Sequence, residues 1–351
     1  MLQAQALDNR LVATSGDDVL VDRIVPGAPL VIAFGFVSWT TRPAFDFYGR
    51  LRKLEQASGQ HLNKILVRDS GNAWYHRRIA GLGGHVDESA QALRELVRRI
   101  APGEVTTIGQ SMGAYAAVMF GLLLDVERIA AFGPLSFLDV RQARLYHELR
   151  WLPVMESLAQ DPPPSGYPDL AALCRARATE TTQIHLAFGT RPDVAHAGAS
   201  TSESVNLDAM HAQRLAPFGR CTLHPFPHSG HAVVQHLIDT KRINGLLAEW
   251  ILGLTLEQEA MPEISREWQD WVAENLRLGC ASAQLVEVLR QHGFSHASSV
   301  AAVTAAGAAP AATWAARCAS APTRRISPRD RRSPRSTARR SSTSVIATAT
   351  R

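Results

Sequence analysis

Short runs of apolar and β-branched residues alternate with longer helical patterns from residue 30 to residue 250. Strands separated by helices pair in parallel, because each helix returns the chain to the same end of the sheet. The expected strands are Leu30–Phe36, Lys64–Arg68, Glu104–Gly109, Arg128–Phe132, Gln183–Phe188 and Arg220–Pro225. The expected helices are Ala44–Ser58, Asp87–Ile100 with Asp87 as its cap, Ser111–Leu124 and His231–Trp250. We therefore predict an α/β fold with a mostly parallel sheet covered by helices on both faces.

One strand-to-helix junction carries the pattern Gly109-Gln110-Ser111-Met112-Gly113. G-x-S-x-G between a strand and a helix is the nucleophile-elbow pattern. Its turn is so sharp that only small residues fit on either side of the serine. The turn places the serine oxygen at the start of the helix, where the helix dipole and the N–H of Met112 stabilise negative charge. We interpret Ser111 as a nucleophile, against the alternative of a chance match to a short pattern.

With this elbow, the sequence resembles the α/β-hydrolase superfamily over roughly residues 30–250. The segments "VRDSGNAWYHRRIAGLGG", "IGQSMGAYAAVMFG" and "IAAFGPLSFL" are similar to a poorly characterised bacterial group of hydrolases. Members of that group are often found beside glycosyltransferase or polysaccharide-related proteins. The resemblance implies a serine hydrolase that cleaves an ester through an acyl-enzyme, with a triad in the chain order Ser, acid, His.

The resemblance places the triad histidine after the last strand, in "TLHPFPHSGHAVVQHL". We favour His231, which follows a glycine and precedes a helix as in the family. His228, three residues earlier, is the alternative. His224 and His236 fall in the interior of a strand and of a helix, where a histidine is usually structural.

Two aspartates compete for the triad acid, and each begins an Asp-x-x-His-Ala pattern. Asp193 follows the Gln183–Phe188 strand at the distance that the superfamily prefers. Asp208 begins "DAMHAQRL", a helical pattern of the kind that the similar bacterial group carries. We favour Asp208 and read the segment between the two as a loop insertion. A helix cap is the other role open to either residue.

The resemblance also assigns an oxyanion hole and a binding loop. The hole pairs the backbone N–H of Met112 with that of Phe36, which follows "LVIAFG". Trp74, Tyr75 and His76 follow the next expected strand, at the edge of the sheet where ligands collect in α/β folds. These three residues either line the substrate pocket or anchor their loop in the core.

The chain divides into three parts by pattern. Residues 1–254 form the predicted α/β-hydrolase domain, and the strand-free interval 134–182 within it is the expected helical cap. Residues 255–300 read as two or three short helices, a small appendage. Residues 301–351 are rich in Ala, Arg and Ser, with few large apolar residues, and we expect disorder there.

The charge distribution and the cysteine spacing argue against some classes of binding partner and site. Residues 321–351 hold nine Arg and one Asp, a charge of +8, so the first 320 residues carry −3 of the total +5. The folded part therefore lacks the basic character of a nucleic-acid surface, although the tail is open to contact with nucleic acid or a membrane. The four cysteines show no paired or metal-type spacing.

The start of the chain, "MLQAQALDNR", lacks the pattern of a secretory leader, and no apolar run is long enough to span a bilayer. We predict a cytoplasmic enzyme without metal or cofactor, acting on a small-molecule or saccharide ester. Acyl transfer on the same triad, and a catalytically silent fold used for binding, are the alternatives. The sequence does not predict an oligomeric state.

Overall fold

A computed structural model describes residues 12–13, 18–22, 24–40, 43–191, 206–227, 229–256, 263–292 and 294–308. It separates into two compact units, Met1–Glu259 and Ala260–Arg351. The division falls five residues after the predicted boundary at residue 254.

The first unit is built on an eight-stranded sheet with the order β1-β2-β4-β3-β5-β6-β7-β8. The six strands from β3 to β8 lie parallel to their neighbours, whereas β1 pairs antiparallel with β2 and β2 antiparallel with β4. The strands are β1 (Val12–Ala13), β2 (Val19–Val21), β3 (Leu30–Phe34), β4 (Asn63–Val67), β5 (Val105–Gln110), β6 (Arg128–Phe132), β7 (Gln183–Gly189) and β8 (Arg220–Phe226). The predicted fold class is confirmed. Of the described strands, the two short strands β1 and β2 were not predicted, because two or three residues are too few to show a period.

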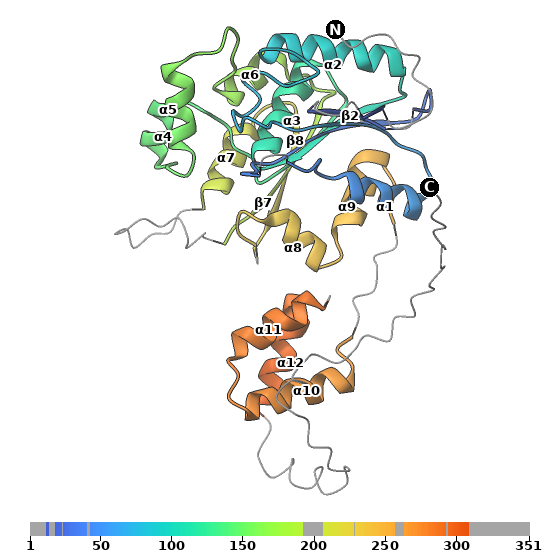
Figure 1. Ribbon diagram of the computed structural model, residues 1–351, viewed down its shortest axis with the longest axis vertical. Coiled ribbons are helices and arrows are strands. Elements are labelled where there is room, and N and C mark those ends of the chain that lie inside the picture. The colour runs from blue at the N-terminus through green and yellow to red at the C-terminus, as the bar shows by residue number, and fades with distance from the viewer. Residues whose placement is uncertain are drawn as a thin grey trace, which may run out of the picture. The chain divides into compact units, whose positions relative to one another are not determined.

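Helices cover both faces of this sheet (Figure 1). One face carries α2 (Val86–Ile100), α3 (Met112–Leu123), α6 (Leu170–Arg177) and α7 (Leu207–Leu215). The other carries α1 (Tyr48–Ser58), α8 (Val233–Asp239), α9 (Ile243–Leu247) and the π-helix η2 (Ala248–Leu252). Strand β3 shows why both faces are apolar. Its Ile32 and Phe34 point into one buried cluster and its Val31 and Ala33 into the other, since successive side chains of a strand point to opposite faces.

Helix α3 is buried along its whole length. Its small residues let it approach the sheet closely, and the Thr107 hydroxyl of β5 donates to the carbonyl of Ala117 at 2.8 Å. A helix buried on every side has a rigidly defined position. The residue that precedes it, Ser111, therefore has a rigidly defined position too.

Two predicted helices differ in detail. The cap position of α2 is His85, without a side-chain hydrogen bond, and Asp87 lies inside the first turn, where its charge favours the helix dipole. The expected helix 231–250 is interrupted between α8 and α9, because Lys241 takes a left-handed conformation with φ of 56°. Helix α9 then continues directly into η2.

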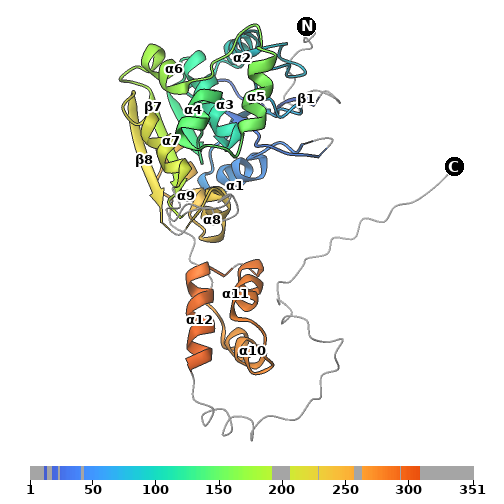
Figure 2. The same ribbon diagram turned by 90° about the vertical axis from the view of Figure 1, so that its left-hand side faces the viewer.

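The second unit consists, in its described part, of the helices α10 (Arg266–Arg277), α11 (Ser282–Gln291) and α12 (His296–Ala308) (Figure 2). Val272, Leu285, Leu289, Phe294 and Val303 form its buried cluster. The expectation of disorder from residue 301 onward is wrong for 301–308, which continue α12. Alanine is the best helix former and Val303 is buried, so this stretch has both propensity and packing. Residues 309–351 lie outside the described part.

Candidate active site

Ser111 occupies a strained turn between β5 and α3. Its φ is 53° and its ψ is −119°, a conformation that costs a non-glycine residue on the order of 1–3 kcal/mol. Its backbone N–H donates to the carbonyl of Phe132 at 2.8 Å. A Cβ on Gly109 would lie 2.1 Å from the carbonyl oxygen of Gly113, and one on Gly113 would lie 2.2 Å from that of Phe34. Both glycines are therefore required by close backbone contact, as the sequence pattern predicts.

We expect Gly113→Ala to lower the free energy of unfolding by about 3 kcal/mol or more, because the added methyl meets backbone atoms that cannot rotate away. At roughly 2–4 °C per kcal/mol, the melting temperature should fall by at least about 6 °C. Gly245→Ala is the matched control. Its Cβ would meet nothing within 4 Å inside α9, and we expect a gain of about 0.5–1 kcal/mol. Equal melting temperatures for the two variants would contradict the close contact at Gly113.

Three side chains from distant parts of the sequence meet at this turn. The hydroxyl of Ser111 lies 3.0 Å from Nε2 of His231. Nδ1 of His231 lies 2.7 Å from Oδ2 of Asp208. In this arrangement the serine O–H donates to Nε2, and Nδ1–H donates to the carboxylate. This is the geometry of a serine nucleophile, a general base and an orienting acid.

Asp208 lies in the first turn of α7, but it is not the helix cap. Asn206 is the cap, and its side chain accepts from the N–H of Ala209 at 2.9 Å. The carboxylate of Asp208 is thereby left to face His231. Asp193, the other candidate acid, and His228, the other candidate base, lie outside the described residues.

His231 follows β8 in a turn that two further glycines make possible, and sequence reasoning missed both. A Cβ on Gly133, after β6, would lie 3.3 Å from Nδ1 of His231. A Cβ on Gly189, at the end of β7, would lie 2.2 Å from the carbonyl oxygens of Ser229 and Gly230. Each glycine ends a strand, which is the only sequence signal of its role. The remaining candidates, His224 and His236, lie within β8 and α8, as predicted.

A serine on a tight strand-to-helix turn above a mostly parallel sheet, with Asp and His following it in that chain order, is the arrangement of one superfamily. The chain has the α/β-hydrolase fold. It differs from chymotrypsin-like and subtilisin-like enzymes, in which the same three residue types occur in other chain orders.

Several solved structures resemble this chain at a distance. Acetyl xylan esterase 1 from Thermoanaerobacterium is 13% identical, with 61% of this chain and 72% of that chain covered and a TM-score of 0.39. The capsule O-acetyltransferase of Neisseria meningitidis serogroup A is 13% identical, with 63% and 86% covered and a TM-score of 0.39. A carboxylesterase of Bacillus subtilis is 13% identical, with 70% and 92% covered and a TM-score of 0.42. No protein-family model and no curated protein matches the chain. We take no activity or substrate from likenesses of this size.

The electrostatic environment keeps Asp208 ionised. Burial alone would raise the pKa of this carboxyl, of which 2% is exposed, but the hydrogen bond from His231 and the positive charge of Arg150 lower the pKa to about 2. Arg150 donates from Nη1 to Oδ1 of Asp208 at 2.9 Å. The side chain of His231 is 24% exposed. The site thus combines a buried anion with a base that solvent can reach.

The predicted oxyanion donors lie on either side of the elbow. The N–H of Met112 belongs to the first turn of α3, where no acceptor exists within the helix. Phe36 lies in the loop that follows β3. This loop is close to the elbow: a Cβ added to Gly113 would lie 2.9 Å from the carbonyl oxygen of Gly35. Within the described residues, neither the N–H of Met112 nor that of Phe36 donates to another protein group.

Trp74, Tyr75 and His76 anchor their loop instead of lining an open pocket. Their exposed fractions are 0%, 0% and 2%. The hydroxyl of Tyr75 donates to the carbonyl of Gly35 at 2.9 Å, and the ring of Trp74 packs edge-on against Trp151 at 5.3 Å. Of the two roles that the sequence left open, the structure favours the anchoring one. Trp74 and Tyr75 both have a left-handed backbone, with φ of 55° and 62°.

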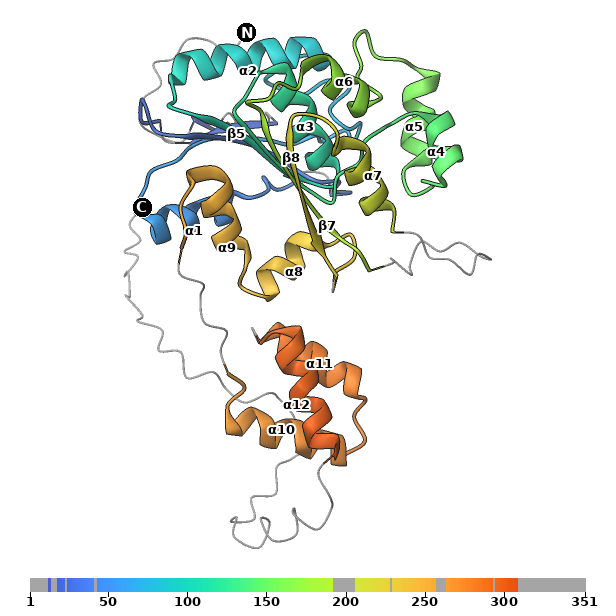
Figure 3. The same ribbon diagram turned by 180° about the vertical axis from the view of Figure 1, so that it is seen from behind.

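The strand-free insertion reaches the site from the side of the acid. It contains α4 (Val140–Tyr146) and α5 (Leu152–Gln160), which lie next to α7 in both front and back views (Figures 1 and 3). Arg150, the partner of Asp208, comes from the connection between these two helices. A cap over Ser111 stays a prediction, but contact between the insertion and Asp208 is direct.

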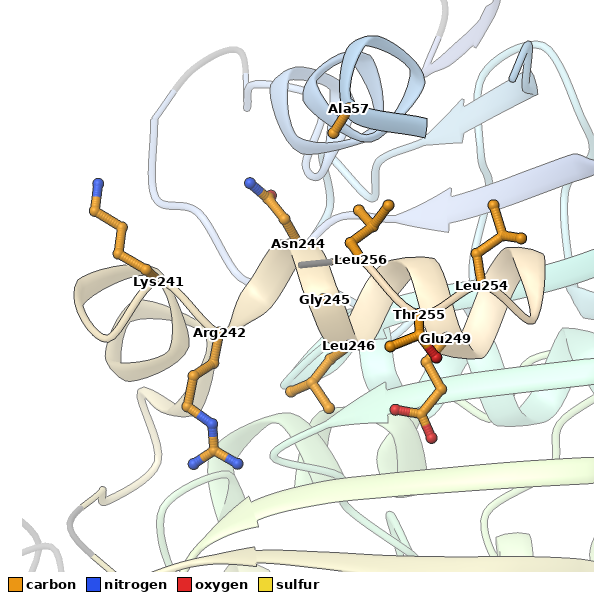
Figure 4. Close-up of a pocket in the computed structure, with 10 residues that line it drawn as sticks. All are labelled: Ala57, Lys241, Arg242, Asn244, Gly245, Leu246, Glu249, Leu254, Thr255 and Leu256. Atoms are coloured by element: carbon orange, nitrogen blue, oxygen red, sulfur yellow. The ribbon is translucent and has the colours of Figure 1, made fainter. Parts of the chain in front are cut away.

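A hollow of about 500 Å³ lies elsewhere on the first unit (Figure 4). It is lined by Ala57, Lys241, Arg242, Asn244, Gly245, Leu246, Glu249, Leu254, Thr255 and Leu256. These residues come from α1, α9, η2 and their flanking turns, and none belongs to the Ser111 site. Its lining holds no serine or cysteine nucleophile, so we do not assign the reaction to it.

Over the described part of the chain, no group of three or more His, Cys, Asp or Glu side chains is arranged to hold a metal ion. Within the same part, none of the helices combines the length and the apolar character needed to span a membrane.

Proposed function

We propose that this protein is a serine hydrolase that cleaves carboxylic esters through an acyl-enzyme. The observation that carries the proposal is the continuous hydrogen-bonded chain from the Ser111 hydroxyl through His231 to Asp208. A serine hydroxyl is a poor nucleophile at neutral pH, and a base within hydrogen-bond reach is what activates it. The strained elbow supports the same role, because backbone strain is commonly kept at functional positions.

In the proposed reaction, Oγ of Ser111 forms a bond to the acyl carbon while its proton moves to Nε2 of His231. The resulting oxyanion accepts hydrogen bonds from the N–H groups of Met112 and Phe36. The tetrahedral intermediate collapses, the ester C–O bond breaks, and the alcohol leaves with the proton from His231. Water then attacks the acyl-enzyme with His231 as base again, and the carboxylic acid and free serine are released.

Partial exposure of the base favours water over a second alcohol as the acyl acceptor. The side chain of His231 is 24% exposed and that of Ser111 is half-buried, so solvent reaches the acyl-enzyme. Acyl transfer to a sugar hydroxyl would need a site that excludes water while the acceptor binds. A small or saccharide ester remains our proposed substrate class, and the cytoplasm our proposed location.

Labelling with a fluorophosphonate, a probe that reacts with activated serines, tests the proposal directly. We expect the full chain to be labelled within minutes at neutral pH, on the peptide that contains Ser111, and to hydrolyse p-nitrophenyl acetate. The matched control is Ser157→Ala, an exposed serine of α5, which should be labelled as fast as the natural protein. A chain that is folded but takes up no label would contradict an activated serine and favour a silent binding module.

A further inference from the structure

Arg150 links the triad acid to a second buried carboxylate. Its Nη1 donates to Oδ1 of Asp208 at 2.9 Å, on the side of the carboxylate opposite His231. Its Nε donates to both oxygens of Glu148 at 3.0 Å, and its Nη2 donates to Oε2 of Glu148 at 2.5 Å. The side chains of Glu148 and Arg150 are 0% and 8% exposed. The guanidinium is therefore held on two sides by buried anions, through two nitrogens by Glu148 and through one nitrogen by Asp208.

Glu148 is held in turn by a neutral histidine. Nε2 of His211 lies 3.1 Å from Oε2 of Glu148. Nδ1 of the same ring accepts from the backbone N–H of Ser136 at 3.0 Å. A backbone N–H can only donate, so Nδ1 carries no proton and the single ring proton is on Nε2, directed at Glu148. Burial, the largest influence on His211, lowers its pKa and agrees with a neutral ring.

The net charge of this network is opposite to that of protonated His231. Glu148 and Asp208 are ionised; for each, burial alone would raise the pKa, but hydrogen bonds and the charge of Arg150 lower it to about 2. With Arg150 between them and His211 neutral, the buried cluster carries one net negative charge. That charge is cancelled when His231 takes the serine proton. Without Glu148, the charges of Arg150 and Asp208 would sum to zero, and the imidazolium would be stabilised less, although Nδ1–H would still donate to Asp208.

We propose that Arg150 and Glu148 are positioning residues of the triad: Arg150 holds the carboxylate of Asp208 toward His231, and Glu148 preserves the net negative charge that the protonated His231 needs. The inference rests on the proposed function of the Ser111 site. Within the described residues, neither side chain hydrogen-bonds to Ser111. Both come from the connection between α4 and α5, so the insertion contributes part of the catalytic electrostatics as well as any cover.

Opposite charge changes at the two positions test this role. The imidazole must be neutral to act as base, so kcat/KM falls on the acid side of the pH profile. Arg150→Met removes a positive charge, favours the protonated imidazole, and should move the midpoint of that acid limb up by about one pH unit. Glu148→Gln removes a negative charge and should move the midpoint down by a similar amount. The double variant restores the net charge, and its midpoint should return to that of the natural protein.

The double variant also separates charge from orientation. It lacks the guanidinium N–H that holds Asp208, so we expect its kcat to stay about 10-fold or more below that of the natural protein, with KM little changed. Arg150→Lys, which keeps the charge but not the fork, should show the same loss of kcat at an unmoved midpoint. Arg144→Met is the matched control. Arg144 forms an exposed ion pair with Glu156 in the same insertion, and its loss should change neither quantity.

The same charge variants, in a Ser111→Ala background, give a readout without activity. NMR follows the titration midpoint of the coupled His231–Asp208 pair, and we expect the same opposite displacements. If the natural protein hydrolyses no ester but these midpoints move apart, the proposed function fails and the charge network stands. If both single variants leave the midpoint in place, or move it in one direction, while only the melting temperature falls, the network is merely structural and our inference is wrong. Should Arg150→Met fail to fold, Arg150→Lys and Glu148→Gln carry the test.

Discussion

Replacement of Ser111 by alanine is expected to lower kcat for p-nitrophenyl acetate by about 10⁴- to 10⁶-fold, the loss seen when a serine hydrolase is deprived of its nucleophile. The reason is that no other hydroxyl is bonded to His231 in the described structure. KM should change little, because the substituted oxygen acts on the transition state more than on the bound ester. Steady-state kinetics on the purified full chain measures both quantities.

The fold should survive this change. Alanine has the same Cβ as serine, so the strain at φ of 53° is unaltered, and we expect the melting temperature to stay within about 2 °C, a change of less than about 1 kcal/mol. Ser157→Ala, on an exposed face of α5, should keep full activity. Residual turnover of Ser111→Ala near that of the natural protein would remove Ser111 from the mechanism and with it the proposed function.

Asp208→Asn is expected to lower kcat by about 10³- to 10⁴-fold. The amide can no longer carry the negative charge that stabilises protonated His231, and its NH₂ group cannot accept from Nδ1–H as the carboxylate does at 2.7 Å. Arg150 loses its anionic partner at the same time. Circular dichroism should show an unchanged fold, since the two side chains have the same shape.

Asp139→Asn is the matched control for this change. Asp139 caps α4 by accepting from the N–H of Gln142 at 2.8 Å, and asparagine caps a helix equally well, so activity and stability should be unchanged. Asp193→Asn is the competing variant. Full activity of Asp208→Asn together with loss of activity in Asp193→Asn would transfer the acid role to Asp193 and overturn the assignment.

The pH dependence of stability follows from the same buried carboxyls. The pKa values of Asp208 and Glu148 are both lowered to about 2 in the folded protein. Groups of this kind contribute stability above their unfolded pKa values and lose it as the pH falls toward the folded ones. The first unit should therefore lose stability steadily between about pH 5 and pH 2.

Much of the fold could be predicted from local sequence patterns, because each pattern has its own physical cause. Six strands were predicted within two residues of their ends, since a parallel sheet buried on both faces needs continuous apolar runs. The elbow was predicted from its glycines, which the backbone contacts of Gly109 and Gly113 require. His231 could be singled out because a glycine and a following helix fix its place after the last strand.

Elements whose apolar residues show no helix or strand period could not be predicted in this way. Strands β1 and β2 are too short to show one. The break at Lys241 depends on a left-handed residue that no glycine marks. The end of α12 reads as low-complexity alanine, and only the packing of Val303 shows that it belongs to a core.

The sequence by itself determined the fold class, the position of the proposed nucleophile and a short list of residues that could act with it, because strand-helix alternation and the G-x-S-x-G turn are constraints between neighbours in the chain. Tertiary structure decided that Asp208 is hydrogen-bonded to His231 and that Trp74 and Tyr75 are buried anchors. It also placed Arg150 against Asp208, with Glu148 on the other side of the guanidinium. These are contacts between residues tens of positions apart. Their distances are set by the packing of the α4–α5 insertion and α7 against the sheet, and no spacing along the chain records that packing.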